Sequence, residues 1–584
     1  MTTPIPRSEH PNPQMKRDTW LNLNGEWDFD FDFNNSGLEK GWNHNPPLSK
    51  KINVPFCPES RMSGIAFTEF IPCCWYRRTL VIDQEELNGL VYLHFGAVDY
   101  SARIFVNGAK AGVHDGGYAS FKLDITTLLH EGENELVVQV IDDIRSHTQP
   151  AGKQSDKLES YGCSYNRTTG IWQTVWLEFT PTEHIDTIRL TPNLTDNSIL
   201  VTVSTIGNGT VKMSASYQGT DCGQAETETS GGRTAAIIRL TESHPWTVGK
   251  GGLYDLTITF NNDTVHTYFG LRSIEVSGED FLINGQRIFQ RLVLDQGFYP
   301  DGIYTAPTAN DLEKDILLAQ SAGFNGARLH EKAFEPLYLY YCDLHGYLAW
   351  GEMANWCLDI TSSTGLENML PEWAEILQRD INHPSIIGWC PFNETWDFNG
   401  RRQDDRVLDI VYRTTKAIDP SRPCIDTSGL FHVNTDIYDV HDYAQDIEQF
   451  ASHFNQLPNK AIDPTYEEPF PERQQYHGGI PFFVSEYGGI KWVPEPQRPN
   501  KYSWGYGEAA KTEQEFLHRY AGLTESLLSN PRMFGFCYTQ LYDVEQECNG
   551  LYSYDRKPKV DINAIRLINE KIAAYEAIRP VADR

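Results

Sequence analysis

The stretch GFNGARLHEKAFEPLYLYYCDLHGYLAWGEM, residues 323–353, has the pattern of one strand–helix–strand unit. FNGAR is a short segment of the kind that forms a buried strand. Pro336 then opens a helix, Leu337 and Tyr341 recur at helical spacing, and Gly346 ends it. The apolar segment YLAWGEM follows as the next strand. This unit predicts two parallel strands joined by a helix.

The same alternation continues through residues 273–584. Further helices are expected from Thr308, around Trp373, around Phe516, and over Ile565 to Ile572. A repeated strand–helix rhythm predicts a parallel sheet with helical crossovers, and this length fits a closed (β/α)8 barrel. A doubly wound open sheet is the alternative. No G-x-G-x-x-G follows an early strand, which disfavours its nucleotide-binding form.

Residues 1–272 have the pattern of strands rather than helices. ELVVQVID alternates between apolar and polar side chains, and ARIFVNGAKAGVH carries Asn107-Gly108, the preferred pair of a two-residue hairpin turn. The length is sufficient for two β-sandwiches. The segment PTEH at 181–184 marks the expected boundary. We therefore expect three domains, residues 1–181, 182–272 and 273–584.

The composition is that of an acidic globular protein. Its formal charge of −30 disfavours nucleic acid and anionic membranes as partners. Eleven cysteines without a C-x-x-C pair disfavour a disulfide framework or a zinc site. The first twenty residues lack the apolar core of a signal peptide, and no apolar run has the length of a membrane span. A cytoplasmic location is the expectation.

Active sites of such barrels lie where the strands end, so the strand ends were searched for reactive groups. They carry Arg328, His330, Glu352, Asn393, Glu394, His441, Tyr443, Glu486, Tyr538 and Gln540. Each of these residues taken singly is more often a structural or solvated residue than a catalytic one. Glu394 and Glu486 differ because each follows an apolar strand and has aromatic neighbours.

A pair of carboxyl groups is the requirement for cleaving a glycosidic bond. One protonates the departing oxygen, and the other attacks the anomeric carbon or activates water. Aromatic surroundings raise the pKa of a carboxyl group by desolvation, as an acid catalyst requires. Aromatic faces also stack on sugar rings, so Trp389 and Trp396 are expected to flank Glu394. The chemistry therefore points to a glycosidase with Glu394 and Glu486 as its pair.

Several motifs resemble glycoside hydrolase family 2, which includes β-galactosidases, β-glucuronidases and β-mannosidases. PFNE before Trp396 and FVSEYGG resemble the motifs around its two catalytic glutamates. LNGEWDF, GAVDYSARIFVNG and TTGIWQTVWLE resemble its jelly-roll sugar-binding domain, and FGLRSIEVSGEDFLINGQ its passage from an immunoglobulin-like domain into the barrel. The resemblance covers nearly the whole chain. It implies a jelly roll, an immunoglobulin-like β-sandwich and a (β/α)8 barrel, in that order.

The resemblance also implies roles. Glu394 corresponds to the acid/base and Glu486 to the nucleophile of a retaining double displacement. Asn393 corresponds to the residue that binds the sugar 2-hydroxyl, Tyr443 to the tyrosine that hydrogen-bonds the nucleophile, and Arg328 to the arginine against it. Retention predicts carboxyl groups about 5–5.5 Å apart.

Three departures from the family limit the assignment of the sugar. His330 stands one place early after the arginine, so its role in the substrate site is open. GEMANWCLD has no histidine for the magnesium site of the large β-galactosidases, so no metal or cofactor is expected. Asn549, in ECNGLYSYDRKPK, takes the place of the lysine with which β-glucuronidases bind the sugar carboxylate. An unpaired carboxylate there is costly, which disfavours glucuronides.

The resulting hypothesis is a retaining exo-glycosidase with galactose as the first choice of sugar. Glucuronic acid, galacturonic acid, mannose and arabinofuranose stay open. Trp396, Gln540 and Asn549 are expected to line the substrate site, with a glycoside or oligosaccharide as partner. The resemblance also makes a homo-oligomer an expectation. A non-catalytic carbohydrate-binding protein and a metal- or nucleotide-dependent barrel enzyme are the competing classes.

Overall fold

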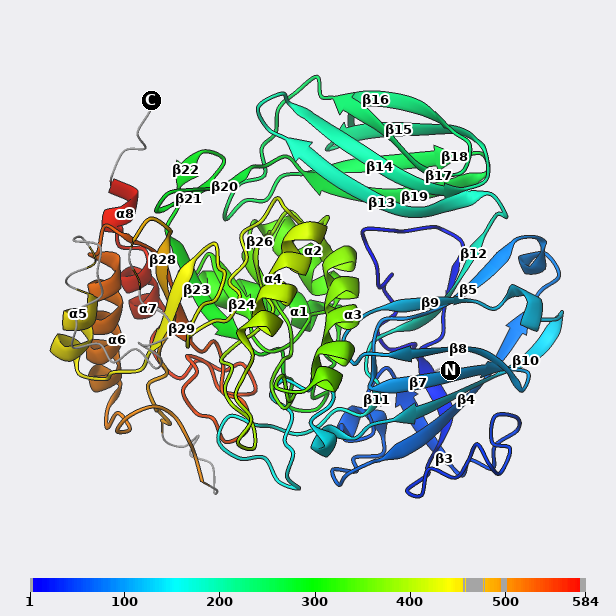
Figure 1. Cartoon of the computed structure of the whole chain (residues 1–584), viewed down its shortest axis with the longest axis horizontal. Coiled ribbons are helices and arrows are strands. Elements are labelled where there is room, and N and C mark those ends of the chain that lie inside the picture. Colours follow the sequence, from blue (N-terminus) through cyan, green and yellow to red (C-terminus); the bar gives the residue numbers. More distant parts are fainter. Residues whose placement is uncertain (1–3, 455–456, 458–475, 477, 495–501, 578–584) are drawn as a thin grey trace.

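The computed structural model describes residues 4–454, 457, 476, 478–494 and 502–577. It contains two β-sandwiches and a barrel surrounded by helices (Figure 1). In the view of Figure 1 the N-terminal sandwich lies to the right of the barrel, and the second sandwich lies above both. Among the described residues no helix combines the length and the apolar character needed to cross a bilayer.

The N-terminal sandwich consists of two antiparallel sheets. One contains β1 (Trp20–Asn22), β12 (Val175–Thr180), β5 (Leu90–Phe95) and β9 (Phe121–Asp124), in that order. The other contains β3 (Lys50–Val54), β2 (Gly25–Phe31), β4 (Cys73–Ile82), β10 (Gly132–Ile141), β7 (Ser101–Val106) and β8 (Ala109–Asp115). A short pair, β6 (Val98–Asp99) with β11 (Gly170–Ile171), lies apart from both. Asn107 and Gly108, both at positive φ, connect β7 to β8, which confirms the predicted hairpin turn.

The second sandwich also consists of two antiparallel sheets. β13 (His184–Asn193), β14 (Ser198–Ile206) and β17 (Gly232–Arg239) form one. β16 (Thr220–Thr229), β15 (Gly209–Tyr217), β18 (Leu253–Phe260) and β19 (Asp263–Gly270) form the other. Apolar side chains that alternate along these strands fill the space between the sheets.

A three-stranded ribbon leads from the second sandwich into the barrel. It contains β20 (Ile274–Ser277), β21 (Asp280–Ile283) and β22 (Gln286–Arg287). Phe281 from this ribbon is fully buried and stacks on Phe534, the second residue of barrel strand β29 (Met533–Thr539). The ribbon therefore covers the end of the barrel where its strands begin, and leaves the end where they finish for chemistry.

The barrel contains a seven-stranded parallel sheet. Its order is β26 (Ile386–Cys390), β25 (Leu348–Glu352), β24 (Gly326–Leu329), β23 (Gln290–Asp295), β29, β28 (Phe482–Gly488) and β27 (Tyr438–Asp442). Parallel bridges from Trp389 to Cys424 and from Asn393 to Ser428 place residues 424–428 beside β26, in the position of an eighth strand. The predicted fold class is confirmed.

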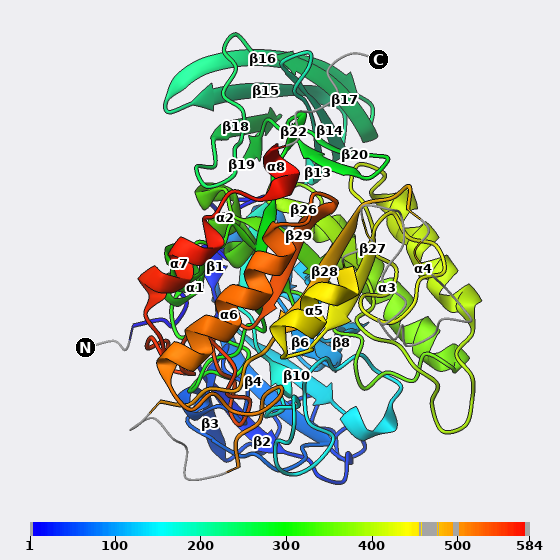
Figure 2. The same ribbon diagram turned by 90° about the vertical axis from the view of Figure 1, so that its left-hand side faces the viewer.

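Helices cover the outside of the barrel. They are α1 (Ala309–Ser321), α2 (Pro336–His345), α3 (Ser363–Asp380), α4 (Asp405–Ile418), α5 (Ile447–Phe454), α6 (Glu513–Leu528), α7 (Ile562–Asn569) and α8 (Ala574–Ala577). Helices α5 and α6 lie outside β28 and β29 (Figure 2). The sequence signals hold for α1, where Thr308 and Asp311 form a capping box, and for α2, which begins at Pro336 and ends at Gly346.

The predicted extent of the last helix is wrong. Helix α7 ends at Asn569, and the Ile572 side chain is 82% exposed. The spacing of the isoleucines extends past the end of α7 because apolar spacing carries no information about the tertiary hydrogen bonds of Asn569. The Asn569 side chain accepts a hydrogen bond from the Tyr520 hydroxyl and donates one to the Ala322 carbonyl. These tertiary bonds hold the end of α7 against α6 and the loop after α1.

Candidate active site

The carboxyl ends of the barrel strands bring the candidate residues together. Arg328 comes from β24, Glu352 from β25, and His441 from β27, while Glu486 lies within β28. Asn393 and Glu394 follow β26 directly. Because the strands are parallel, groups at their carboxyl ends all reach the same mouth of the barrel. The residues are far apart in the sequence and share one site.

Glu394 and Glu486 face each other across His441. The Nδ1 atom of His441 lies 2.7 Å from Glu394 Oε1, and its Nε2 atom lies 3.4 Å from Glu486 Oε1. One ligand atom from each of the three residues can be chosen so that all three lie within 4.8 Å of one another. The glutamate pair therefore spans a gap of the size that a single anomeric carbon requires.

Glu486 is held by two side-chain donors, one from strand β24 and one that directly follows strand β27. Arg328 Nη1 lies 3.1 Å from Oε1, and the Tyr443 hydroxyl donates to Oε2. Burial raises the pKa of Glu486, but the positive charges of His441 and Arg328 outweigh burial and lower that pKa below its usual value. Glu486 is therefore ionised, as a nucleophile must be.

Arg328 organises both halves of the site. It is fully buried and donates to Glu352 Oε1 at 2.6 Å, to the Ser485 carbonyl at 2.9 Å, to Glu486 at 3.1 Å and to Asn393 Oδ1 at 3.1 Å. The planar guanidinium can reach several acceptors at fixed angles, which a lysine cannot. Through this one side chain the positions of Glu486 and Asn393 are coupled.

The environment of Glu394 differs from the sequence-based expectation. Burial raises the pKa of Glu394, but the hydrogen bond and the charge of His441 lower it overall. The partners that set the pKa are therefore His441 and other charged groups, and the expected increase from indoles is wrong. Trp389 is 1% exposed, donates to Asp419 at 2.8 Å and packs on Trp373 from the helix layer.

Trp396 does lie at the site. Its side chain is 47% exposed and meets the Trp356 ring edge to face. Both indoles line a cavity of about 380 Å³ together with Glu394. The cavity also contains residues from the N-terminal sandwich, among them Tyr161 and Cys163.

His330, Gln540 and Asn549 lie in the site but are deeply buried. His330 Nδ1 is 3.2 Å from Glu352 Oε2 and 3.8 Å from Glu486 Oε1, so His330 reaches both carboxylates that surround Arg328 despite its altered spacing. Gln540 donates to Asn549 at 2.7 Å. Asn549 in turn donates to Glu547 at 3.0 Å.

A loop of the N-terminal sandwich forms one wall of the mouth. Ala151 and Gly152 donate their backbone N–H groups to the carbonyls of Trp356 and Ala354, both at 3.1 Å. Farther along the loop, the Tyr165 hydroxyl donates to Glu547. The site is therefore composite, and neither the barrel nor the sandwich completes it alone.

Sequence reasoning missed three residues of this wall and its surroundings. Lys153, Trp356 and Glu547 carried no recognisable motif, and Lys153 lies far from the barrel in sequence. His441 was noted at a strand end but not placed between the glutamates. The donor atoms of Glu394, His441 and Glu486 are the kind that can bind a metal ion, so the expectation of no metal stays a prediction.

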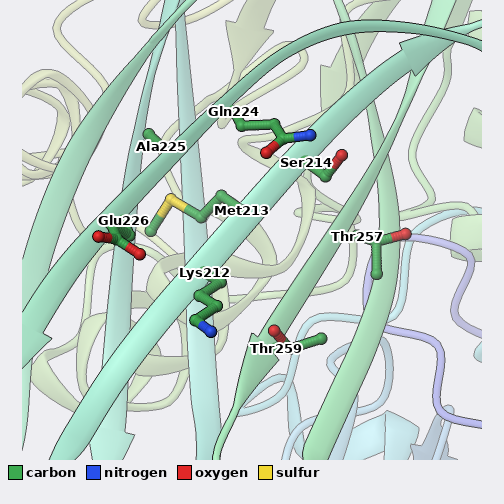
Figure 3. Close-up of a pocket in the computed structure, with 8 residues that line it drawn as sticks. All are labelled: Lys212, Met213, Ser214, Gln224, Ala225, Glu226, Thr257 and Thr259. Atoms are coloured by element: carbon green, nitrogen blue, oxygen red, sulfur yellow. The ribbon is translucent and has the colours of Figure 1, made fainter.

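A second depression lies away from the barrel mouth. It measures about 360 Å³ and lies on the sheet of β15, β16 and β18 in the second sandwich, where Figure 3 shows Lys212, Gln224 and Glu226 beside Thr257 and Thr259. These side chains offer no pair of carboxyl groups. The barrel mouth is therefore the better candidate for chemistry.

Comparison with known families agrees with this architecture. Residues 21–181 match the sugar-binding domain of glycosyl hydrolases family 2, residues 183–272 match the family 2 model that follows it, and residues 274–574 match the family's TIM barrel domain. The chain belongs to glycosyl hydrolases family 2. This confirms the family that the motifs around Glu394 and Glu486 indicated.

Individual relatives are distant. A putative β-glucuronidase of Formosa agariphila is 28% identical over 72% of this chain and 51% of its own length, so the chain matches about half of that protein. A β-glucuronidase of Felis catus is 24% identical over 69% of this chain and 67% of its own length. A β-galactosidase of Thermoanaerobacter pseudethanolicus is 25% identical over 66% of this chain and 52% of its own length. The solved β-glucuronidase of Ruminococcus gnavus in complex with D-glucuronic acid matches 97% of this chain and all of that chain, with a TM-score of 0.79 and 18% identity. That structure shows the fold only.

Proposed function

We propose that the protein is a retaining exo-acting β-glycosidase. The observation that carries the proposal is the placement of Glu394 and Glu486 at the barrel mouth, where one carboxyl oxygen of Glu394 lies within 4.8 Å of one carboxyl oxygen of Glu486. An inverting pair stands farther apart, at about 6.5–9.5 Å, to admit a water molecule. The short gap therefore supports direct attack by one carboxylate.

In the first step Glu486 attacks the anomeric carbon and forms a glycosyl ester. The glycosidic bond breaks, and its electron pair goes to the departing oxygen. That oxygen takes a proton from Glu394 in the fraction of molecules in which the carboxyl group is protonated, a fraction that His441 reduces by lowering the pKa of Glu394. Arg328 and the Tyr443 hydroxyl hold Glu486 in position. Because Arg328 binds Asn393 through Oδ1, the amide nitrogen of Asn393 is directed away from the guanidinium and toward the sugar 2-hydroxyl.

In the second step Glu394 acts as a base. It takes a proton from water, and the oxygen of that water attacks the anomeric carbon and releases Glu486. His441, in contact with both glutamates, supplies positive charge between them throughout. Burial lowers the pKa of His441, but Glu486 and Glu394 raise it overall, so the imidazole favours its charged form.

For the sugar, we propose a terminal β-linked hexuronic acid, with D-glucuronic acid first. The support is the predominance of β-glucuronidases among the relatives described above, although one relative is a β-galactosidase. The prediction of galactose is not confirmed, and galactose becomes the alternative. Asn549 stands at the position of the family's lysine and carries no charge, so another residue must supply the cation that binds the carboxylate.

A panel of aryl β-glycosides tests the proposal. We expect the wild type to hydrolyse the glucuronide and Glu486→Ala to lose that activity. Azide should restore cleavage by Glu486→Ala, with a glycosyl azide of inverted configuration as the product. Glu508→Ala, at an exposed glutamate, is the matched control and should keep full activity. If the purified protein binds glycosides but hydrolyses none, it is a carbohydrate-binding protein instead.

A further inference from the structure

Lys153 brings a positive charge from the N-terminal sandwich into the barrel mouth. Its side chain is only 6% exposed, and its Nζ atom lies 3.5 Å from the centroid of the Trp356 ring. The Trp356 indole donates to the Asn393 carbonyl at 3.0 Å. Lys153 is therefore separated from the residue before Glu394 by a single side chain.

The backbone fixes this lysine in place. Gly152 has φ of +57°, and a Cβ there would lie 2.2 Å from the Glu331 carbonyl oxygen, so only glycine fits against the barrel. On the other side, the carbonyl of Lys153 accepts the Tyr165 N–H at 2.7 Å. The backbone is therefore held at Gly152 and at Lys153 itself, which fixes where the Lys153 side chain begins.

The ammonium lacks a direct anionic partner. Lys153 forms no salt bridge within the described part of the chain, and Glu547, Glu486 and Glu331 act on it only at longer range. Burial lowers the pKa of Lys153, but these negative groups and Cys163 raise it overall, so the side chain is charged. A buried charge without a paired ion is costly unless a ligand completes it.

Among the described residues, no lysine or arginine forms a hydrogen bond or an ion pair with Asn549 or with its partner Glu547. Asn549 stands where a lysine would bind a carboxylate, and its amide is bound to Gln540 and Glu547. Tyr165 connects Lys153 to this group, because its N–H donates to the Lys153 carbonyl at 2.7 Å and its hydroxyl donates to Glu547. The positive charge missing at Asn549 is therefore supplied from the other domain.

We infer that Lys153 is the specificity-determining residue that binds the carboxylate of a terminal uronic acid, an inference that rests on the proposed glycosidase function. The ammonium forms an ion pair with the sugar carboxylate and remains on the Trp356 face. A neutral hexose at the same place offers a hydroxymethyl group, which gains much less from a cation. The cation thus favours uronides over the corresponding neutral glycosides.

The test compares two substrates that differ only at this carboxylate, an aryl β-D-glucuronide and the matching aryl β-D-glucoside with the same uncharged aglycone. Lys153→Met should lower kcat/KM for the glucuronide by about 100-fold or more, since truncating one partner of a buried charge pair has that effect. The glucoside should change by less than about threefold, which also shows that the variant is folded. Lys153→Arg should keep a measurable part of the preference.

Lys157→Met, at an exposed lysine of the same loop, is the matched control and should leave both substrates unchanged. If the wild type cleaves the glucuronide and Lys153→Met lowers kcat/KM equally for both substrates, or for neither, the role of Lys153 is wrong while the proposed glycosidase function stands. If the wild type cleaves neutral glycosides and no uronide, the proposed sugar is overturned together with it. An effect limited to substrates with an anionic aglycone would place the ion pair at the leaving group and contradict the assignment.

Discussion

Arg328→Lys tests the coupling between Glu486 and Asn393, the two groups that the guanidinium holds together. Lysine keeps the charge but cannot reach all four acceptors of the guanidinium. Two of these bonds, to Glu486 and Asn393, orient groups that would touch the sugar. A hydrogen bond involving a charged group contributes about 1.5–3 kcal/mol, so losing both costs about 3–6 kcal/mol, or roughly 10²- to 10⁴-fold in kcat/KM.

The assay is steady-state hydrolysis of an aryl glycoside, with thermal unfolding measured on the same samples. Arg422→Lys is the control, because Arg422 is also buried in the barrel and donates to Asp419, the Ile386 carbonyl and the His383 carbonyl, outside the site. We expect the control to lose stability and keep the kcat/KM of its folded fraction. An Arg328→Lys enzyme within threefold of the wild type in kcat/KM would refute the coupling.

Two further predictions concern charge at the site. Burial raises the pKa of Glu486, and the positive charge of His441 lowers it. His441→Gln should therefore raise the pKa of Glu486 and move the acid limb of the kcat/KM profile to higher pH. His345→Gln, which removes a histidine paired with Glu313 outside the site, is the control, and an acid limb that does not move in His441→Gln would contradict the role of His441. Dialysis against a chelator should leave kcat/KM unchanged, because Arg328 and His441 already supply the positive charge at the two glutamates. Loss of activity that a divalent ion restores would instead show a metal at Glu394, His441 and Glu486.

The barrel was predictable where local chemistry specifies it. Pro336 and Gly346 mark the two ends of α2, and Thr308 caps α1, because these residues act on their own backbone. Residues 424–428 gave no such signal. They occupy the eighth strand position through isolated bridges to β26, and that position depends on the closed barrel around it.

The candidate site shows the same division. Glu394 and Glu486 were predictable as site residues because each comes at the end of an apolar segment. The prediction that Trp389 flanks Glu394 was wrong. Side chains alternate along a strand, and Trp389 points to the helix layer, where it meets Trp373. Lys153 was not predictable from the barrel sequence, since its position depends on how the N-terminal sandwich docks onto Trp356 and Ala354.

Trapping of the glycosyl ester shows which carboxylate attacks the anomeric carbon. A 2-fluoro-substituted glycosyl fluoride of the hydrolysed sugar slows the second step, and peptide mass mapping then identifies the labelled residue. We expect one label per chain, on Glu486, and none in Glu486→Ala. A label on Glu394 or on any other residue, or turnover with no covalent intermediate and an inverted product, would contradict it.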